Sequence, residues 1–321
     1  MLLIQMSPDR NCAPQVNATS VNPSDVDTAE GGGCKRGCGA DVSGNVVSCK
    51  GSSNFSPGDA VWTLSSPAYQ DYIVQPAARL SSRPKTLDHH HAGTLPEVGL
   101  TSFFSLMRTA AAPGTPLPSG SPWDTTTKYK NLTVVVTAGA GGTGMIGLQL
   151  AKAWGAKHIA TATTGAAGEA FVRSLGATFV TDYKKEDIFD VLPDNSVDIV
   201  YDNYGAEHTA DKAMRAIRPG GAYLMMPHGI CYELKLQRPP CLAKHAKPGV
   251  TQLNFDTSPD FTNNMKTGLD RLAQLVDSAA LMAPLDSTFA FEDIALAFNY
   301  SAGPGEGGVS AGHRGKISVV M

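Results

Sequence analysis

Two patterns of hydrophobic positions divide the chain. Up to about residue 100, short apolar runs such as Val46–Val47, Ala60–Trp62 and Tyr72–Val74 alternate with turns rich in glycine, proline and serine. Short apolar runs bounded by such turns are typical of β-strands. We therefore expect the first hundred residues to form a β-rich domain.

From residue 131 onward, strands and helices alternate. Leu132–Thr137 is a run rich in β-branched residues, typical of a strand buried on both faces. The next segment carries Ile146, Leu150 and Trp154 at four-residue spacing, which places them on one face of a helix. Further strands are expected at His158–Ala162, Thr178–Thr181, Val197–Tyr201 and Ala222–Met226. This alternation predicts an α/β fold with a doubly wound parallel sheet, the Rossmann arrangement.

The last part of the chain predicts a return to the first domain. After about residue 250 we expect one more strand and a long amphipathic helix with Met265, Leu269, Leu272 and Val276 on its apolar face. A closing strand is expected at Ile317–Val320. The predicted organisation is a β-rich domain over 1–100, a nucleotide-binding domain over 101–280 with a loop insertion at 111–131, and a return over 281–321.

The clearest chemical signal is a glycine-rich turn after the first strand of the α/β part. Its residues, Gly139, Ala140, Gly141, Gly142, Thr143 and Gly144, form a complete G-x-G-x-x-G between a strand and a helix. In that context the pattern predicts a dinucleotide site. A pyrophosphate must approach backbone N–H groups at the start of a helix, and a Cβ there would block it.

The end of the second strand bears on which dinucleotide is bound. An NAD site usually has an acidic residue there, whereas this chain has Thr163 and Thr164. Hydroxyl groups without a carboxylate suit a 2′-phosphate better, so we predict NADPH. Tyr183, which follows the third strand, is the expected additional neighbour of that phosphate. The adjacent Lys184 and Lys185 are either phosphate contacts or part of a solvated helix start.

Composition excludes several classes of protein. The chain has 321 residues with 26 basic and 29 acidic side chains, a net charge of −3, and no basic block, which argues against nucleic acid as the partner. No apolar run approaches the ~20 residues of a membrane-spanning helix. Six cysteines in a chain of this length do not form a disulfide framework, so a cytoplasmic location is expected. A small-molecule substrate is the expected partner.

The landmarks of the whole chain resemble those of a known family, the zinc-independent quinone oxidoreductase branch of the medium-chain dehydrogenase/reductase superfamily. This resemblance implies a GroES-like catalytic domain beside the Rossmann domain. The matching segments, in family order, are Ser20–Asp25, Gly39–Gly44, Pro57–Asp59, Leu95–Thr101, Ala138–Gly144, Gln149–Ala156, Leu175–Ala177, Asp182–Tyr183, Tyr201–Gly205, Arg218–Gly221 and His313–Ile317.

The resemblance also implies catalysis without a metal. Zinc-dependent alcohol dehydrogenases of the superfamily have a cysteine ligand where Asn22 stands and a histidine ligand where Ala40 stands. Their four-cysteine lobe is missing after Trp62. The spacing of Cys34, Cys38 and Cys49 does not fit the usual four-ligand structural zinc site, so no metal is expected.

By the same resemblance, the protein is an NADPH-dependent reductase that transfers hydride to a quinone or an α,β-unsaturated carbonyl. Asn22 and Thr101 would lie near the nicotinamide and its ribose. Asn203, Pro227 and His228, at the ends of two strands, would line the cofactor side of the cleft. No proton donor is identified; Tyr72 and His228 are the candidates. The family also implies a homodimer.

Two alternatives remain open. An enoyl-thioester reductase is disfavoured because no tyrosine follows the Asn22-Pro23 segment. A non-catalytic, regulatory NADPH-binding protein is favoured by the segment before Ser20, which is shorter than in the family and predicts a missing strand pair.

Overall fold

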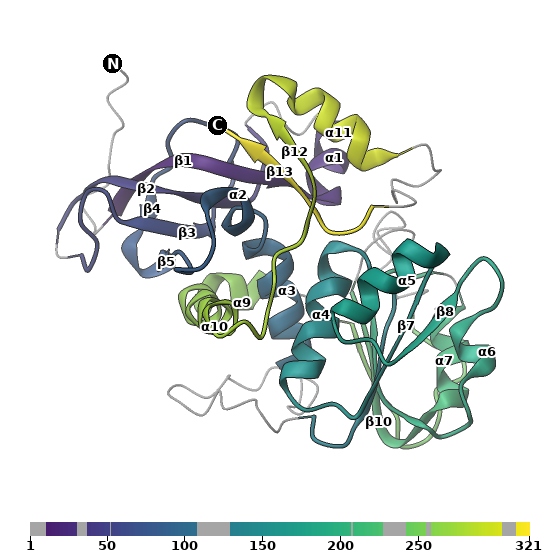
Figure 1. The fold of residues 1–321 in the computed structure, drawn as a ribbon. Coiled ribbons are helices and arrows are strands. Elements are labelled where there is room, and N and C mark those ends of the chain that lie inside the picture. Colours follow the sequence, from purple (N-terminus) through teal and green to yellow (C-terminus); the bar gives the residue numbers. More distant parts are fainter. Residues whose placement is uncertain are drawn as a thin grey trace. The chain divides into compact units, whose positions relative to one another are not determined.

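The computed structural model describes residues 11–30, 37–51, 53–107, 129–206, 208–226, 242–254, 258–303 and 313–321. The chain forms two compact units (Figure 1). Unit 1 comprises Met1–Leu100 and Asp260–Met321, and unit 2 comprises Thr101–Pro259. The two units meet at Leu100/Thr101 and at Pro259/Asp260.

Unit 1 is built on a mixed seven-stranded sheet, sheet A. Antiparallel pairing of the first and last strands joins the two ends of the chain in the middle of this sheet. The strand order is β12 (Leu285–Ala290), β13 (Lys316–Val320), β1 (Asn11–Val21), β2 (Asp41–Cys49), β3 (Ala60–Leu64) and β5 (Ser81–Ser82), and β4 (Gln75–Pro76) pairs with β1.

The long strand β1 is absent from the sequence prediction. It contains Pro14, and its pairing with β2 shifts register between Ala13 and Pro14 and again between Val16 and Ala18. Such irregularities break the alternation by which a strand is recognised. The strand predicted at Tyr72–Val74 is instead an isolated bridge between Tyr72 and Gln15.

The helices of unit 1 explain the position of the second boundary. Helix α10 (Met265–Asp277) packs against β3 and β5 of sheet A, with Leu269 and Leu272 fully buried. The predicted apolar face of this helix is therefore confirmed. It covers sheet A of unit 1, whereas the sequence analysis assigned the helix to the nucleotide-binding domain. The further helices are α1 (Pro23–Glu30), α2 (His89–Ala92), α9 (Ser258–Asn263), α11 (Ile294–Ala302), the short η2 (Ala77–Arg79) and η4 (Phe291–Asp293), and α3 (Pro96–Met107), which crosses the boundary.

Unit 2 is the predicted α/β unit. Its six strands are all parallel and run in the order β11 (Thr251–Asn254), β10 (Ile217–Met225), β9 (Val197–Asp202), β6 (Thr133–Val136), β7 (His158–Thr163) and β8 (Phe179–Asp182). When the six strands are numbered 1 to 6 along the chain and read from β8 to β11, their order is 3-2-1-4-5-6, that of the doubly wound dinucleotide-binding fold. The Rossmann prediction is confirmed.

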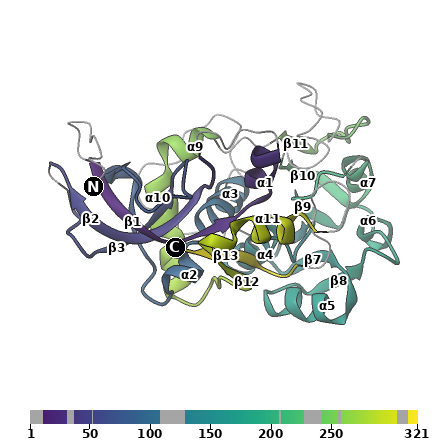
Figure 2. The same cartoon turned by 90° about the horizontal axis from the view of Figure 1, so that it is seen from above.

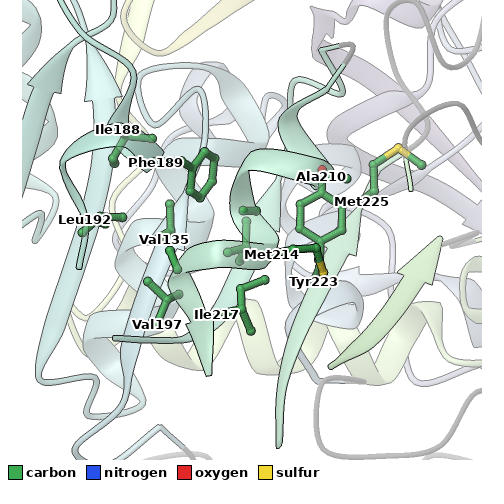
Figure 3. Packing of buried hydrophobic residues seen from close by; sticks show 14 residues of the cluster. Val135, Ile188, Phe189, Leu192, Val197, Ala210, Met214, Ile217, Tyr223 and Met225 are labelled. Carbon is green, nitrogen blue, oxygen red and sulfur yellow. The ribbon is translucent and has the colours of Figure 1, made fainter. Parts of the chain in front are cut away.

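Helices cover both faces of this sheet. α6 (Ile188–Val191) and α7 (Thr209–Ala216) pack on the face that carries Val135, Val200 and Tyr223 (Figures 1 and 3). α4 (Gly142–Ala153) lies on the opposite face, where Gly147 approaches Val136 and Tyr201. α5 (Gly165–Ser174) packs against β7 and β8. Strand residues alternate between the two faces, and the central strand β6 carries buried valines on both, Val134, Val135 and Val136.

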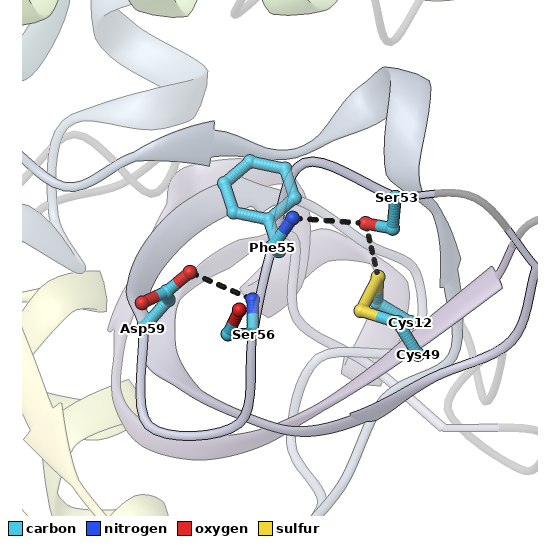
Figure 4. Close-up of a disulfide and its surroundings, with 6 residues drawn as sticks. All are labelled: Cys12, Cys49, Ser53, Phe55, Ser56 and Asp59. Atoms are coloured by element: carbon cyan, nitrogen blue, oxygen red, sulfur yellow. Dashed lines mark hydrogen bonds between the residues drawn. A yellow bond between two sulfur atoms is a disulfide. The ribbon is translucent and has the colours of Figure 1, made fainter.

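Two cysteines of sheet A form a disulfide. Cys12 on β1 is bonded to Cys49 on β2, and Ser53 contacts the Cys12 sulfur (Figure 4). Cys38 is also disulfide-bonded. The thiols of Cys38 and Cys49 are therefore not free to bind a metal, and Cys34 lies outside the described residues. The expectation that the cysteines stay unpaired is wrong for these residues, while the cytoplasmic location stays a prediction.

The part of the chain that the structure describes contains no helix long and apolar enough to cross a membrane. Figure 2 shows the same fold turned by 90°.

Candidate functional site

The order of the strands in unit 2 defines where a ligand can bind. The chain runs from β6 outward to β8 on one side and from β9 outward to β11 on the other. Ligands of such sheets bind at the carboxyl ends of the strands, at the point where this direction reverses. In this protein that point lies between the ends of β6 and β9.

The glycine-rich turn connects β6 to α4 at this point. Gly144 is packed against the turn itself, because a Cβ on it would come 2.1 Å from the Ala138 carbonyl oxygen. Gly141, the N-cap residue of α4, has only that same oxygen at 3.3 Å. Gly144 is thus required by the fold, whereas Gly141 leaves open the space in front of the helix. Ser102 of α3 supports the turn by donating to the Thr143 carbonyl oxygen at 2.9 Å.

The open space in front of α4 suits an anion. Among the described residues no side chain caps the helix, no acidic residue lies in its first turn, and the N–H groups of Gly142, Thr143 and Gly144 have no partner within the helix. These groups and the helix dipole favour negative charge. They form a cradle that fits a pyrophosphate; Gly141 contributes open space to it, while its own N–H donates to the Ala138 carbonyl oxygen at 2.9 Å.

A buried carboxylate ties the turn to the end of β9. Asp202 accepts hydrogen bonds from the Thr137 hydroxyl at 2.7 Å, from the backbone N–H groups of Tyr204 and Gly205 at 3.0 and 3.1 Å, and from the Tyr223 hydroxyl at 2.6 Å. Burial raises the pKa of the Tyr223 phenol, which keeps it a donor. Asp202 was not predicted as a site residue. Its signal in the sequence is an acidic residue at the end of an otherwise apolar strand.

Asn203, a predicted cofactor residue, lies in this network with its amide orientation fixed. Its backbone N–H donates to the Thr137 hydroxyl, and its Nδ2 donates to the carbonyl oxygens of Thr137 and Tyr201 at 3.2 and 3.3 Å. Its Oδ1 is buried and has no hydrogen-bond partner among the described residues. An unpaired buried acceptor is costly, so this oxygen fits a donor on a ligand, such as a ribose hydroxyl.

The structure also brings together the residues predicted for the adenine ribose. Thr163 pairs in register with Asp182, and the Tyr183 N–H donates to the Thr163 carbonyl oxygen at 3.0 Å. Tyr183 is exposed, and Thr164 caps α5 without bonding to it through its side chain. Asp182 lies among them, and the sequence analysis assigned it no role.

Asn22, the predicted nicotinamide neighbour, lies in unit 1 within a buried acid cluster, which we define as Asp25, Asp41, Glu97 and Lys316. Asn22 Nδ2 donates to Asp41 at 2.8 Å, and Asn22 Oδ1 accepts from Lys316 Nζ. The side-chain amide therefore links a carboxylate to an ammonium group. Asp41 is fully buried and also accepts from the Ser20 hydroxyl and from the Glu97 N–H.

The two other carboxyl groups of the cluster carry raised pKa values. Burial, together with the neighbouring Asp41 and Asp25 carboxyl groups, raises the pKa of Glu97 to about 8 against the opposing effect of Lys316. Burial likewise raises the pKa of Asp25, which accepts from the Asn22 N–H and the Tyr69 hydroxyl. At neutral pH Glu97 is thus a neutral acid, and its Oε1 accepts from the Ser24 hydroxyl.

Stability should therefore depend on pH through Glu97. Its pKa in the folded protein lies above the ordinary 4.5, so the folded state binds more protons between these values and loses stability as the pH rises through this window. We expect the free energy of unfolding to fall by about 1–2 kcal/mol from pH 6 to pH 8. The Glu97→Gln variant should show a flatter profile in urea denaturation, and an equally steep profile would contradict this assignment.

The remaining predicted residues are placed as follows. Thr101 lies on α3 and is 7% exposed. Tyr72 is exposed at the isolated bridge of unit 1. Pro227 and His228 lie outside the described residues. Among the described residues, no group of three or more acidic, histidine or cysteine side chains is arranged to hold a metal ion.

A parallel sheet in this order, with an uncapped glycine turn at its switch point, defines a dinucleotide-binding protein. Residues 175–317 match the family described as "Zinc-binding dehydrogenase". The relatives described below are similar to this chain in sequence, and the solved structure described below is similar to it in fold.

Two of the three relatives described here share a name, and the three differ in how much of each chain the similarity covers. The zebrafish (Danio rerio) protein "NAD(P)H oxidoreductase RTN4IP1, mitochondrial" is 32% identical over 56% of this chain and 44% of its own length. The mouse (Mus musculus) protein of the same name is 28% identical over 88% of this chain and 76% of its own length. The "Chloroplast envelope quinone oxidoreductase homolog" of Arabidopsis thaliana is 37% identical over 45% of this chain and 41% of its own length.

A solved structure supports the fold. The crystal structure of an alcohol dehydrogenase superfamily protein from Novosphingobium aromaticivorans superposes with a TM-score of 0.75 at 22% identity, covering 100% of this chain and 95% of that chain.

Proposed function

We propose that this protein is an NADPH-dependent oxidoreductase that reduces quinones or α,β-unsaturated carbonyl compounds without a metal. The general class, a nicotinamide-dependent oxidoreductase, is supported by the names of its relatives. The quinone or enone substrate is the finer proposal, for which the Arabidopsis relative gives the support. The observation that carries the proposal is the glycine cradle beside the buried, unpaired Asn203 Oδ1.

The residues of unit 2 have distinct tasks in this proposal. The N–H groups at the start of α4 bind the pyrophosphate, and Asn203 Oδ1 accepts from a ribose hydroxyl. Asp202 is a positioning residue for both of these groups, because its hydrogen bonds fix the end of β6 relative to the end of β9. When bound, NADPH supplies a hydride to the acceptor.

The proposal that no metal takes part rests on Asn22. This residue stands where zinc-dependent members have a cysteine ligand, and its amide oxygen accepts from the Lys316 ammonium group. Because the Lys316 ammonium group already binds this amide oxygen, a metal cation cannot bind there as well. Metal analysis of the purified protein should therefore find substoichiometric zinc, and one zinc per chain would contradict the proposal.

The first experiment is a titration of the purified protein with NADPH and NADH, followed by the fluorescence of the reduced nicotinamide. We expect both to bind, NADPH more tightly. Turnover with a quinone or an enal then separates a reductase from a non-catalytic NADPH-binding protein. Turnover with an enoyl thioester alone would favour the enoyl-thioester reductase.

Replacing Asn203 with leucine tests the binding assignment. The variant keeps the size of the side chain but removes the unpaired acceptor, so the Kd for NADPH should rise roughly tenfold, the value of about one hydrogen bond. Thermal unfolding without cofactor is the control, because the lost Nδ2 bonds also affect the fold. A variant that unfolds like the wild type and binds NADPH equally well would overturn the assignment.

The homodimer also remains a proposal. β11 and β8 are the edge strands of the described part of the parallel sheet and are the strands through which sheets of two copies would pair. Light scattering on the purified protein measures the mass directly.

A further inference from the structure

The end of β8 carries a carboxylate that faces the groups expected to receive the adenine ribose. Asp182 accepts from the Lys184 N–H at 3.1 Å and forms an ion pair with Lys185 Nζ at 3.5 Å. One acidic side chain thus engages the turn after β8 and one of the two lysines that the sequence offers for a 2′-phosphate.

Asp182 is ionised under all ordinary conditions. Hydrogen bonds from the Lys184 N–H and the Thr164 hydroxyl, together with Lys185, lower the pKa of its carboxyl group. Its side chain is 24% exposed, so the charge lies at the surface, where a ligand can reach it. The neighbouring Tyr183, Lys184 and Glu186 are exposed as well.

In folds of this order the residue after the second strand meets the adenine ribose, and in NAD sites it is acidic. Here the second strand ends in Thr163 and Thr164, and the acidic residue comes from the neighbouring strand at the paired position. A carboxylate at this place accepts well from a free 2′-hydroxyl. It repels a 2′-phosphate, which carries a charge of about −1.5 to −2 at neutral pH.

We propose that Asp182 narrows the preference of this protein for NADPH over NADH by opposing the 2′-phosphate of NADPH. It does so in two ways, by its own charge and by holding the Lys185 ammonium group that the phosphate would otherwise engage. The inference rests on the proposed function, since it concerns the same cofactor site. It accounts for a site that has phosphate-binding groups and an acidic residue side by side.

The test is the Asp182→Asn variant. Asparagine keeps an oxygen for the Lys184 N–H, so the turn after β8 should fold as before, while the negative charge is lost. The Kd for NADPH, measured by nicotinamide fluorescence, should fall roughly tenfold, as expected for removal of one charge near a dianion in water. The Kd for NADH should change less than threefold, so the ratio of the two Kd values is the readout.

Asp190→Asn is the matched control. It makes the same change of charge at an exposed position of α6 in the same unit, and the preference should stay that of the wild type. Lys185→Gln is the complementary variant and should weaken NADPH binding without weakening NADH binding.

The outcomes separate this inference from the function on which it rests. A wild-type protein that binds neither cofactor contradicts the proposed function. A wild-type protein that binds NADPH, together with an Asp182→Asn variant of unchanged NADPH affinity, overturns the inference and leaves the proposed function standing. An equal gain in the Asp190→Asn control also overturns it, because the effect would then be one of net charge.

Discussion

The Gly144→Ala variant is expected to lose measurable NADPH binding, with at least a hundredfold rise in Kd. A methyl group on this residue would come 2.1 Å from the Ala138 carbonyl oxygen and 2.9 Å from the Gly139 Cα. Both are backbone atoms, so the turn between β6 and α4 has to move. Because the anion cradle consists of backbone N–H groups, a shift of the turn removes the site itself.

Gly141→Ala is the matched control for that experiment. Its Cβ would meet a single backbone oxygen at 3.3 Å, and its φ of −78° suits alanine. Thermal unfolding should therefore leave Gly141→Ala close to the wild type and lower the Tm of Gly144→Ala. NADPH binding should weaken in both, because the Gly141 methyl group fills the space in front of the helix. If Gly141→Ala binds NADPH as tightly as the wild type, the pyrophosphate does not bind in front of α4.

Replacing Lys316 with methionine should lower the free energy of unfolding by about 3–5 kcal/mol, as is usual when one partner of a buried ion pair is removed. Lys316 is 4% exposed, and its Nζ lies 3.9 Å from the fully buried Asp41 carboxylate. It also donates to Asn22 Oδ1 and to the Val21 carbonyl oxygen. Without it, the acid cluster has no positive charge.

The double variant Lys316→Met/Asp41→Asn distinguishes a charge effect from a packing effect. It removes both buried charges, so it should recover part of the stability that the single variant loses. Urea denaturation of the four proteins gives the coupling free energy. If the double variant loses as much free energy of unfolding as the two single variants together, the ion pair contributes nothing. The loss in Lys316→Met would then come from poor packing of the methionine.

Within unit 2, the sequence carries most of the information that determines the fold. The β-branched run before the glycines and the turn itself are local signals, and both lie where they were expected, in β6 and at the start of α4. Thr163, Thr164 and Tyr183 were also expected together, because parallel strands place their carboxyl ends at one edge.

The acid cluster could not be recognised in the same way. Asp25, Asp41, Glu97 and Lys316 come from four separate parts of the sequence, and each alone resembles a solvated charge. They meet only because β13 pairs with β1 and α3 begins beside β2. Asp25 and Glu97 lie in the first turns of helices α1 and α3, where an acidic residue is ordinary and gives no signal of burial.

Helix α10 shows the same limit for packing. The spacing of Met265, Leu269 and Leu272 predicts an apolar face correctly, but periodicity does not say which sheet that face covers. The structure places it on β3 and β5, which moves the boundary of the unit to Asp260.

The pairing of β1 with β13 has a consequence for the order in which the chain folds during synthesis. Unit 2 is continuous and has all of its residues once position 259 has left the ribosome, whereas the central strand of sheet A must wait for Lys316–Val320. Until then Asp41 and its neighbours lack their ammonium partner. Unit 2, which carries the glycine-rich turn, therefore matures first, and unit 1 is completed only when β13 has been made.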